Sequence, residues 1–271
     1  MRNAVDMASN IDTNNIDANS DQPDITRRFG GVSRLYGSQG LARFQAANVC
    51  VIGIGGVGSW AVEALARNAV GRITLIDLDN IAESNVNRQL HAVDGAFGKA
   101  KVTAMAERIV SINPDCIVQQ IEDFVTVDNV HAMLAGGFDV VLDAIDDARA
   151  KVAIAAYCRT QKIKLVITGA AGGRLDPTRI QVADLTKVTG DRLLAKVRNS
   201  LRRDHDFPRG EKAKFNIQAV YSDEQIKKPE AICEVDVALS GLNCAGYGSS
   251  VCVTAPFGMA AAAIVLKSLL N

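Results

Sequence analysis

A glycine-rich turn constrains the fold of this chain more strongly than any other feature. The turn reads Gly-Ile-Gly-Gly-Val-Gly over residues 53–58 and follows 48–52, which is almost wholly apolar, as strands covered on both faces of a sheet are. The first glycine permits a sharp turn, the middle pair lets the backbone approach an anion, and the last lets a helix pack close to the strand. The helix predicted over 57–68 then directs its free N–H groups at that anion.

An acidic residue follows where a nucleotide-binding unit needs one. The next strand, predicted over 72–76, ends at Asp77, whose carboxylate can accept hydrogen bonds from two ribose hydroxyls. A tight turn followed by an unrelated acidic strand end is the alternative interpretation. The order of strand, turn, helix, strand and acid favours nucleotide binding.

Strand-like and helix-like segments alternate along the rest of the chain. Strands are predicted at 116–121, 139–143 and 164–168, with an edge strand at 180–184. Residues 28–44 are expected to be helix and loop, and helices are predicted at 99–113, 129–134 and 148–161. This alternation predicts an α/β fold with a doubly wound, mostly parallel sheet of Rossmann type and a less regular C-terminal half. Such sheets bind their ligands beyond the carboxyl ends of the strands.

Composition limits the domain organisation. Residues 1–25 are polar with little periodicity, which predicts a disordered tail. We expect 26–271 to form a single domain, with a nucleotide-binding part at about 26–170 and a substrate-facing part at about 171–271. The formal net charge is zero, so nucleic-acid binding would require a local basic patch. Without a secretory signal or a C-x-x-C pair, a cytoplasmic location is expected.

The cysteines divide into two groups. Three lie in or beside apolar stretches: Cys50, Cys116 and Cys158. We expect these to be buried, inert thiols. The other three leave open a thioester nucleophile: Cys233, Cys244 and Cys252. A small residue in a loop is the simpler interpretation, because no activating neighbour is evident.

The C-terminal segment 251–270 is the one candidate for membrane contact in the sequence. It contains Pro256, Gly258 and Lys267 among many small residues. A buried helix that starts near Pro256 explains it more simply than a bilayer span.

Charged residues beyond the turn favour a triphosphate over a dinucleotide. Arg88 lies in a polar loop, and Lys99 and Lys101 open the next predicted helix. With Asp143 and Asp146 at a neighbouring strand end, these residues are typical of a triphosphate clamp and its metal. A structured loop with a solvated arginine is the alternative.

Together these elements resemble the ThiF/MoeB superfamily, the bacterial relatives of ubiquitin-activating enzymes. The matching motifs are Ser33-Arg34-Leu35-Tyr36-Gly37, the glycine turn, Asp77-x-Asp79, Ser84-Asn85-x-Asn87-Arg88-Gln89, Gly98-x-x-Lys101 and Asp143-x-x-Asp146. The reaction that the resemblance implies is adenylation, in which a carboxylate attacks the α-phosphate of ATP and pyrophosphate leaves. It implies ATP and Mg²⁺ as cofactors and leaves a monovalent cation open.

The resemblance also implies roles for individual residues. The expected nucleotide-binding residues are Gly53, Gly55, Gly56, Gly58, Asp77, Asp79, Asn85, Arg88, Gln89 and Lys101. The expected catalytic residues are Arg34, Arg88, Lys101 and Asp146. Asp146 would act near magnesium. In homodimers of this family the arginine at the position of Arg34 reaches into the partner's site, so a homodimer is expected.

The second half is similar to one subfamily, the tRNA threonylcarbamoyladenosine dehydratases. The likeness rests on 168–178, Asp184-Leu185, Asp191 and 243–248, and is weakest over 209–233. It implies that the chain activates the carboxylate of the threonylcarbamoyl group on adenosine 37 of tRNA. A nitrogen of the same group then closes a ring, and water is lost overall.

A tRNA partner requires a basic surface. Arg192, Lys196 and Arg203 fall on one predicted helical face and are the candidates, because phosphate contacts of this kind give salt-sensitive binding. A solvated helix face is the alternative. His91 lies close to the Arg88 loop, and we expect an ordinary surface histidine there; a residue that borders the site is the alternative.

Three other functions stay open. One is adenylation of the C-terminus of a sulfur-carrier protein, against which the lack of zinc-binding C-x-x-C pairs argues. Another is an NAD-dependent oxidoreductase, against which Arg88, Lys101 and Asp146 argue. The third is a sulfur-relay scaffold that binds a cysteine desulfurase or its sulfur-acceptor protein.

Overall fold

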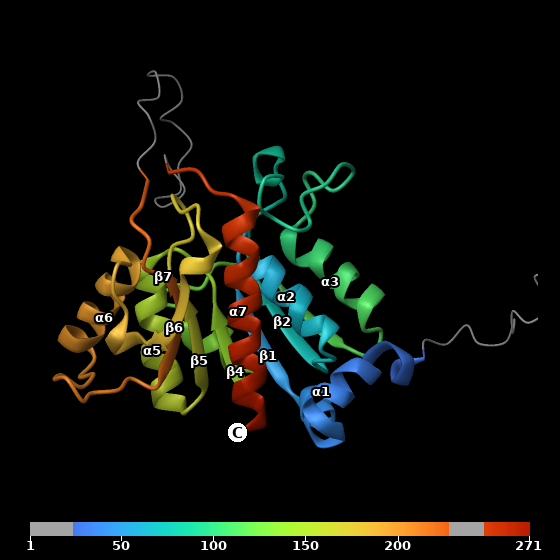
Figure 1. Ribbon diagram of the computed structural model, residues 1–271, viewed down its shortest axis with the longest axis horizontal. Helices are drawn as coiled ribbons and strands as arrows, with labels where there is room; N and C mark the ends of the chain where they lie inside the picture. Colours follow the sequence, from blue (N-terminus) through green and yellow to red (C-terminus); the bar gives the residue numbers. More distant parts are fainter. Residues whose placement is uncertain (1–23, 228–246) are drawn as a thin grey trace, which may run out of the picture.

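The computed structural model describes residues 24–227 and 247–271. The strands are β1 (Asn48–Ile52), β2 (Arg72–Ile76), β3 (Ile117–Ile121), β4 (Val140–Asp143), β5 (Lys164–Thr168), β6 (Ile180–Asp184) and β7 (Ile217–Ser222). They form a seven-stranded sheet in the order β3-β2-β1-β4-β5-β7-β6 (Figure 1). Neighbouring strands are parallel, except that β6 runs antiparallel to β7 at one edge. The predicted α/β class and doubly wound sheet are confirmed.

Helices cover both faces of the sheet. They are α1 (Ile25–Ala46), α2 (Gly58–Arg67), α3 (Lys101–Ile112), α4 (Val130–Met133), α5 (Ala148–Gln161), α6 (Arg192–Asp204) and α7 (Val251–Leu270), with 3-10 turns η1 (Glu83–Asn85), η2 (Pro177–Arg179) and η3 (Leu185–Lys187). One hydrophobic core lies between the sheet and α2, α3 and α7. A second core lies between the opposite face and α4, α5 and α6.

Helix α7 crosses the front of the sheet beside α2 (Figure 1). A Cβ on Gly258 would lie 2.4 Å from the Val57 carbonyl oxygen, so the two helices meet backbone to backbone. Among the described residues, α7 is the one helix long and apolar enough to cross a membrane. Its Phe257 and Val265 are fully buried in the first core, as a core helix requires.

The structure corrects three expectations. Helix α7 begins at Val251, so Pro256 lies inside it instead of near its start. Strand β7 was not predicted, yet it lies between β5 and β6. The predicted tail included 24 and 25, but Asp24 caps α1 by accepting a hydrogen bond from the Arg27 N–H at 2.9 Å. Residues 1–23 lie outside the described residues.

Candidate active site

The glycine turn lies at the switch point of the sheet. Strands β1 and β4 are neighbours, and their following helices α2 and α5 pack on opposite faces, which opens a ligand crevice at the strand ends. Gly53 has a φ of 85°, and a Cβ on it would lie 2.8 Å from Ile145 Cγ2. A Cβ on Gly58 would lie 1.8 Å from the Gly53 carbonyl oxygen. The positive φ and the approach of the loop after β4 therefore require glycine at 53, and close packing of α2 on the strand end requires glycine at 58.

Asp77 ties the end of β2 to the glycine turn. Its Oδ2 accepts a hydrogen bond from the Ile54 N–H at 2.6 Å, and its Oδ1 accepts one from the Asp79 N–H at 2.9 Å. Burial raises the pKa of Asp77, and the charge of Lys101 opposes that rise. The side chain of Asp77 is 8% exposed and that of Asp79 is 55% exposed. Asp79 is therefore the carboxylate that a ligand reaches more easily.

Lys101 joins this acidic pair from the first turn of α3. Its Nζ donates a hydrogen bond to Asp79 Oδ2 at 2.6 Å and lies 3.7 Å from Asp77 Oδ1. Lys99, which the sequence placed beside it, is bonded to Glu107 instead, at 2.8 Å. The structure thus places Lys101, but not Lys99, beside the two aspartates.

Arg88 lies against the glycine turn. Its Cγ is 3.1 Å from the point where a Cβ on Gly56 would stand. Its Nη1 donates hydrogen bonds to the Ser84 carbonyl oxygen at 2.8 Å and to Asn87 Oδ1 at 2.9 Å. The side chain is half-buried, so a guanidinium already oriented by protein acceptors borders the crevice.

Two helices support the loop that carries Arg88. The Trp60 Nε1–H of α2 donates to the Arg88 carbonyl oxygen at 3.0 Å, and the Thr254 hydroxyl of α7 donates to the same atom at 3.4 Å. Asn87 Nδ2 donates to the Ser249 carbonyl oxygen at 2.7 Å. The start of α7 therefore helps to position the Arg88 loop.

Asn85 and Gln89 are buried at the same place. Asn85 Oδ1 accepts a hydrogen bond from the Ala82 N–H at 3.1 Å, so this oxygen shapes the loop. Gln89 Nε2 lies 3.9 Å from the point where a Cβ on Gly55 would stand. The amide of Gln89 is thus directed toward the turn.

His91 is buried, so the expectation of a surface histidine is wrong. It is 5% exposed, and its Nε2 lies 3.1 Å from Gln89 Oε1. Burial, assisted by the charge of Lys101, lowers the pKa of His91 to about 4. The ring is therefore neutral in the folded protein near neutral pH.

The end of β4 contains a buried ion pair that sequence reasoning missed. Lys151 Nζ donates to Asp143 Oδ1 at 2.9 Å, and both side chains are fully buried. Burial raises the pKa of Asp143, and Lys151 opposes the rise. The pair anchors the loop on which Asp146 is exposed. The position of Lys151 among Ala and Ile on a predicted helix was the available signal.

The remaining predicted residues lie apart from this cluster. Arg34 is exposed on α1. Helix α1 contacts the C-terminal end of α3, where Arg28 donates a hydrogen bond to the Ile112 carbonyl oxygen. Lys101, which borders the crevice, lies at the opposite, N-terminal end of α3. Arg192, Lys196 and Arg203 are exposed on α6. In residues 24–227 and 247–271, no three His, Cys, Asp or Glu side chains converge to hold a metal.

The cysteine predictions are partly tested. Cys50, Cys116 and Cys158 are buried as predicted, and burial raises the pKa of Cys116 to about 11. Cys252 is exposed in the first turn of α7. Cys233 and Cys244 lie outside the described residues.

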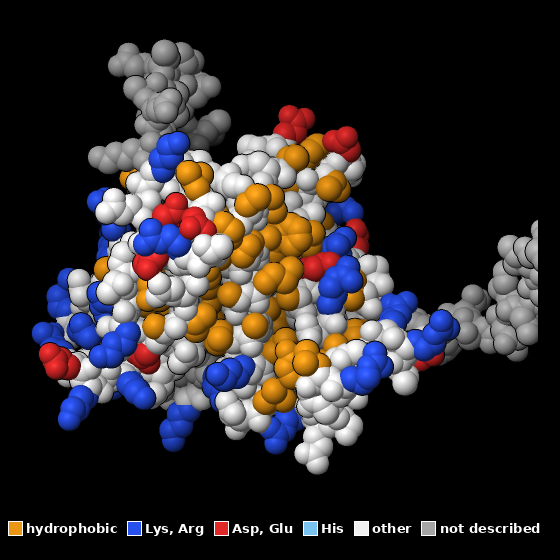
Figure 2. Space-filling model, viewed as in Figure 1, with side chains coloured by type: hydrophobic (Ala, Val, Ile, Leu, Met, Phe, Trp, Pro, Cys, Tyr) orange, Lys and Arg blue, Asp and Glu red, His pale blue; other side chains and the backbone are white. Residues whose placement is uncertain are grey.

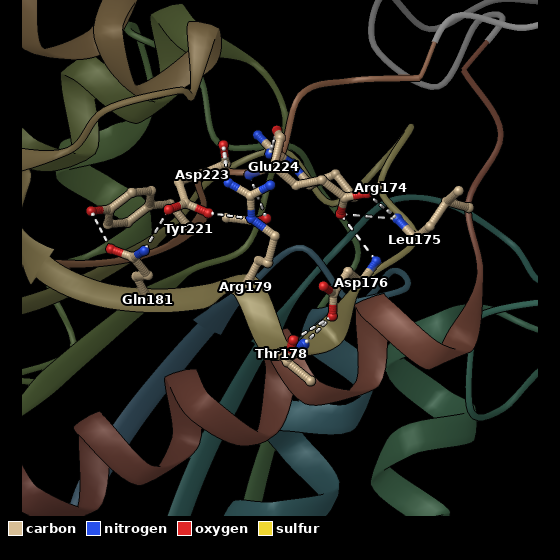
Figure 3. A network of polar contacts seen from close by, with 10 residues as sticks. Arg174, Leu175, Asp176, Thr178, Arg179, Gln181, Tyr221, Asp223 and Glu224 are labelled. Atoms are coloured by element: carbon tan, nitrogen blue, oxygen red, sulfur yellow. Dashed lines mark hydrogen bonds and ion pairs between the residues drawn. The ribbon is translucent and has the colours of Figure 1, made fainter.

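A second polar network organises the loop after β5 (Figure 3). Arg174 is buried, donates to the Ala170 carbonyl oxygen at 2.8 Å and also bonds the Glu224 carbonyl oxygen. It lies 3.4 Å from Asp191 Oδ2, and Asp191 caps α6 by accepting a hydrogen bond from the Leu194 N–H. The network joins β5, α6 and the end of β7 near the carboxyl edge of the sheet.

Comparisons with known proteins agree with this architecture. A model of the ThiF family matches residues 30–271. The tRNA threonylcarbamoyladenosine dehydratase of Haemophilus influenzae is 48% identical over 246 residues, which cover 90% of this chain and 94% of that protein.

Two solved structures are similar along nearly their whole length. The crystal structure of the Escherichia coli tRNA N6-threonylcarbamoyladenosine dehydratase in complex with ATP has a TM-score of 0.82 and 46% identity, and the match covers 90% of this chain and 94% of that one. The complex of the same enzyme with AMP has a TM-score of 0.81 and 46% identity, with coverage of 90% and 95%. The chain described here therefore belongs to the ThiF family.

Proposed function

We propose that this protein is an ATP-dependent enzyme that dehydrates N6-threonylcarbamoyladenosine at position 37 of tRNA to its cyclic form. The observation that carries the proposal is the sequence identity of 48% and 46% to dehydratases of this specificity, over 90% of this chain in both comparisons. The cluster at the switch point supports it, because it combines a glycine turn with the exposed carboxylates of Asp79 and Asp146, the half-buried Arg88 and the buried Lys101.

The proposed nucleotide contacts come from this cluster. The glycine turn offers backbone N–H groups to the phosphates, and Asp79 accepts hydrogen bonds from the ribose. Arg88 and Lys101 bind the triphosphate, and Asn85 and Gln89 complete the pocket. We expect Mg²⁺ to be held by Asp146 together with the phosphates, since Mg²⁺ in such sites takes only one or two carboxylates. When bound, the ion neutralises phosphate charge.

The proposed reaction has two steps. The threonyl carboxylate attacks the α-phosphorus of ATP, pyrophosphate leaves, and a mixed anhydride with AMP forms. A nitrogen of the same modification then attacks the activated carbonyl, loses its proton, and expels AMP. The nucleoside thereby loses one oxygen and two hydrogens. Arg88 and Lys101 act by holding the reacting groups in place and stabilising charge.

The proposal includes a homodimer in the cytoplasm. Arg34 lies on α1, outside the cluster of its own chain, which supports the expectation that it serves the site of a partner subunit. Residues of about 26–170 then bind the nucleotide, and those of about 171–271 face the substrate.

A substrate comparison tests the proposed function. We would measure AMP release from labelled ATP and Mg²⁺ with modified tRNA, with tRNA lacking the threonylcarbamoyl group, and with a carrier protein ending in Gly-Gly. Of the three substrates, only the modified tRNA is expected to cause AMP release. AMP release only with the carrier protein would instead identify a sulfur-carrier-activating enzyme.

A further inference from the structure

Basic side chains gather over α6 and the loop that follows it. Nine of the 30 Lys and Arg residues fall within 187–214, against four acidic residues, although the whole chain has no net charge. Figure 2 shows these basic side chains on one side of the molecule, over α6 and the loop beneath it. The segment is therefore a local positive patch of the kind that nucleic-acid binding requires.

Contacts within the protein already engage some of these basic side chains, which leaves fewer to bind a partner. Arg198 Nη1 donates to the Val188 carbonyl oxygen at 2.6 Å, and the Arg202 guanidinium lies 5.4 Å from the Phe215 ring centre. Arg203 makes two hydrogen bonds to Asp204, each 2.7 Å long. These three side chains are already engaged within the protein.

Two further side chains are engaged by backbone carbonyl oxygens, Lys187 by that of Glu211 at 2.6 Å and Arg209 by that of Arg202 at 2.9 Å. Of the nine, four exposed basic side chains remain, and we call them the basic strip: Arg192, Lys196, Lys212 and Lys214. Arg192 and Lys196 lie on the outer face of α6, because Leu194, Val197 and Leu201 turn the opposite face into the core. No salt bridge occupies any of the four among the described residues.

The loop that carries the two lysines of the strip is held in place. Phe207 and Phe215 pack edge to face with ring centres 4.7 Å apart, and the Arg159 guanidinium lies 4.3 Å from the Phe207 ring centre. Thr186 donates a hydrogen bond to the Ala213 carbonyl oxygen at 3.2 Å. The positive charges are therefore presented by a packed loop, which lowers the entropy lost when a partner binds.

The strip starts at the functional edge of the sheet. Asp191, next to Arg192, accepts a hydrogen bond from the Ala170 N–H at 2.9 Å, and Ala170 follows the carboxyl end of β5. From there α6 runs for 13 residues, or about 20 Å, toward the loop that holds Lys212. A nucleotide bound at the sheet edge would leave its neighbouring backbone close to this path.

We infer that the basic strip binds the phosphate backbone of the tRNA beside the modified nucleotide. The inference rests on the proposed function and adds the surface through which the substrate is held. It retains Arg192 and Lys196 from the predicted set, replaces Arg203 because Asp204 neutralises it, and adds Lys212 and Lys214.

Matched charge removal tests the inference. The strip variant Lys196→Ala/Lys212→Ala and the control variant Arg27→Ala/Lys267→Ala each remove two exposed positive charges. We would measure tRNA affinity by filter binding at several salt concentrations, together with kcat and KM for dehydration. The strip variant should bind tRNA roughly tenfold more weakly. The slope of log binding constant against log salt concentration should become less steep by about 1 to 2. Its KM for tRNA should rise while its kcat at saturation stays unchanged.

The outcomes separate this inference from the proposed function. A strip variant that binds and dehydrates tRNA like the wild type overturns the strip and leaves the proposed function standing. An equal loss in the control variant also overturns it, because the effect would then be one of net charge. A wild-type protein that neither binds nor dehydrates tRNA overturns both.

Discussion

Lys101 and Asp79 are joined by a 2.6 Å hydrogen bond between the start of α3 and the loop after β2. The lysine is nearly buried and Asp79 is half exposed, so the bond lies at the boundary between the core and the crevice. It places a positive charge between two carboxylates, because Asp77 Oδ1 is 3.7 Å away. Without this charge, both carboxylates would repel a triphosphate.

Lys101→Met is expected to weaken ATP binding by at least tenfold, because the loss of one charge-assisted contact costs about 1.5–3 kcal/mol. Isothermal titration of ATP in the presence of Mg²⁺ measures this. Lys99→Met is the matched control, since Lys99 pairs with Glu107 at the surface and should leave the affinity unchanged. Unchanged ATP affinity in Lys101→Met would remove Lys101 from the site.

Two alanine substitutions in the glycine turn should separate folding from binding. A Cβ on Gly58 would meet the Gly53 carbonyl oxygen at 1.8 Å, so Gly58→Ala should lower the free energy of unfolding by at least about 2 kcal/mol. A Cβ on Gly55 has room, with its nearest neighbour 3.9 Å away. Gly55→Ala should therefore fold normally and bind ATP more weakly, because its Cβ would stand where phosphate approaches. Urea unfolding and ATP titration of both variants check this; normal ATP affinity in Gly55→Ala would contradict it.

Arg174 should matter more to stability than Arg179, although both belong to one network (Figure 3). Arg174 is fully buried beside Asp191, whereas Arg179 bonds Asp223 at the surface. Arg174→Met should destabilise the protein by roughly 3 kcal/mol, because it leaves a buried carboxylate without its partner charge. Arg179→Met should leave the midpoint of urea unfolding nearly unchanged. Equal midpoints for the two variants would contradict this account of the network.

His91 should make the protein less stable in acid. Its pKa is lowered to about 4 in the folded state from 6.5, so between these values the unfolded chain binds more protons. Stability should therefore fall as the pH falls, by about 2 kcal/mol between about pH 7 and about pH 5 from this group alone. Urea unfolding at the two pH values should show that His91→Gln loses less free energy of unfolding than the wild type does. The exposed control His205→Gln should behave like the wild type.

Much of this fold can be predicted from the sequence where local pattern and tertiary environment agree. Strand β2 and helix α5 have the predicted bounds because their apolar runs and flanking turns act locally. Strand β7 was missed because its place between β5 and β6 is decided by pairing with strands distant in the sequence. The edge strand β6 was found from its alternation.

The site was predictable where a residue type has a chemical use at a recognisable spacing. Arg88 was assigned to a triphosphate clamp, and in the structure it lies against the glycine turn. The burial of His91 had no local signal, because burial of a polar side chain depends on packing from separate elements. The Ala and Ile neighbours of Lys151 pointed to its burial but did not identify its partner Asp143. The engagement of Arg203 by Asp204 likewise depends on side-chain geometry.

The mass of the modified nucleoside is the decisive test of the proposed dehydration. The protein would be incubated with ATP, Mg²⁺ and tRNA carrying threonylcarbamoyladenosine, and the digested nucleosides would be weighed by mass spectrometry. We expect the modified nucleoside to lose the mass of one water only when ATP is present. The variants Arg88→Ala and Asp146→Ala should abolish this loss while remaining folded. An unchanged nucleoside mass after incubation of the wild-type protein with ATP would contradict the proposed function.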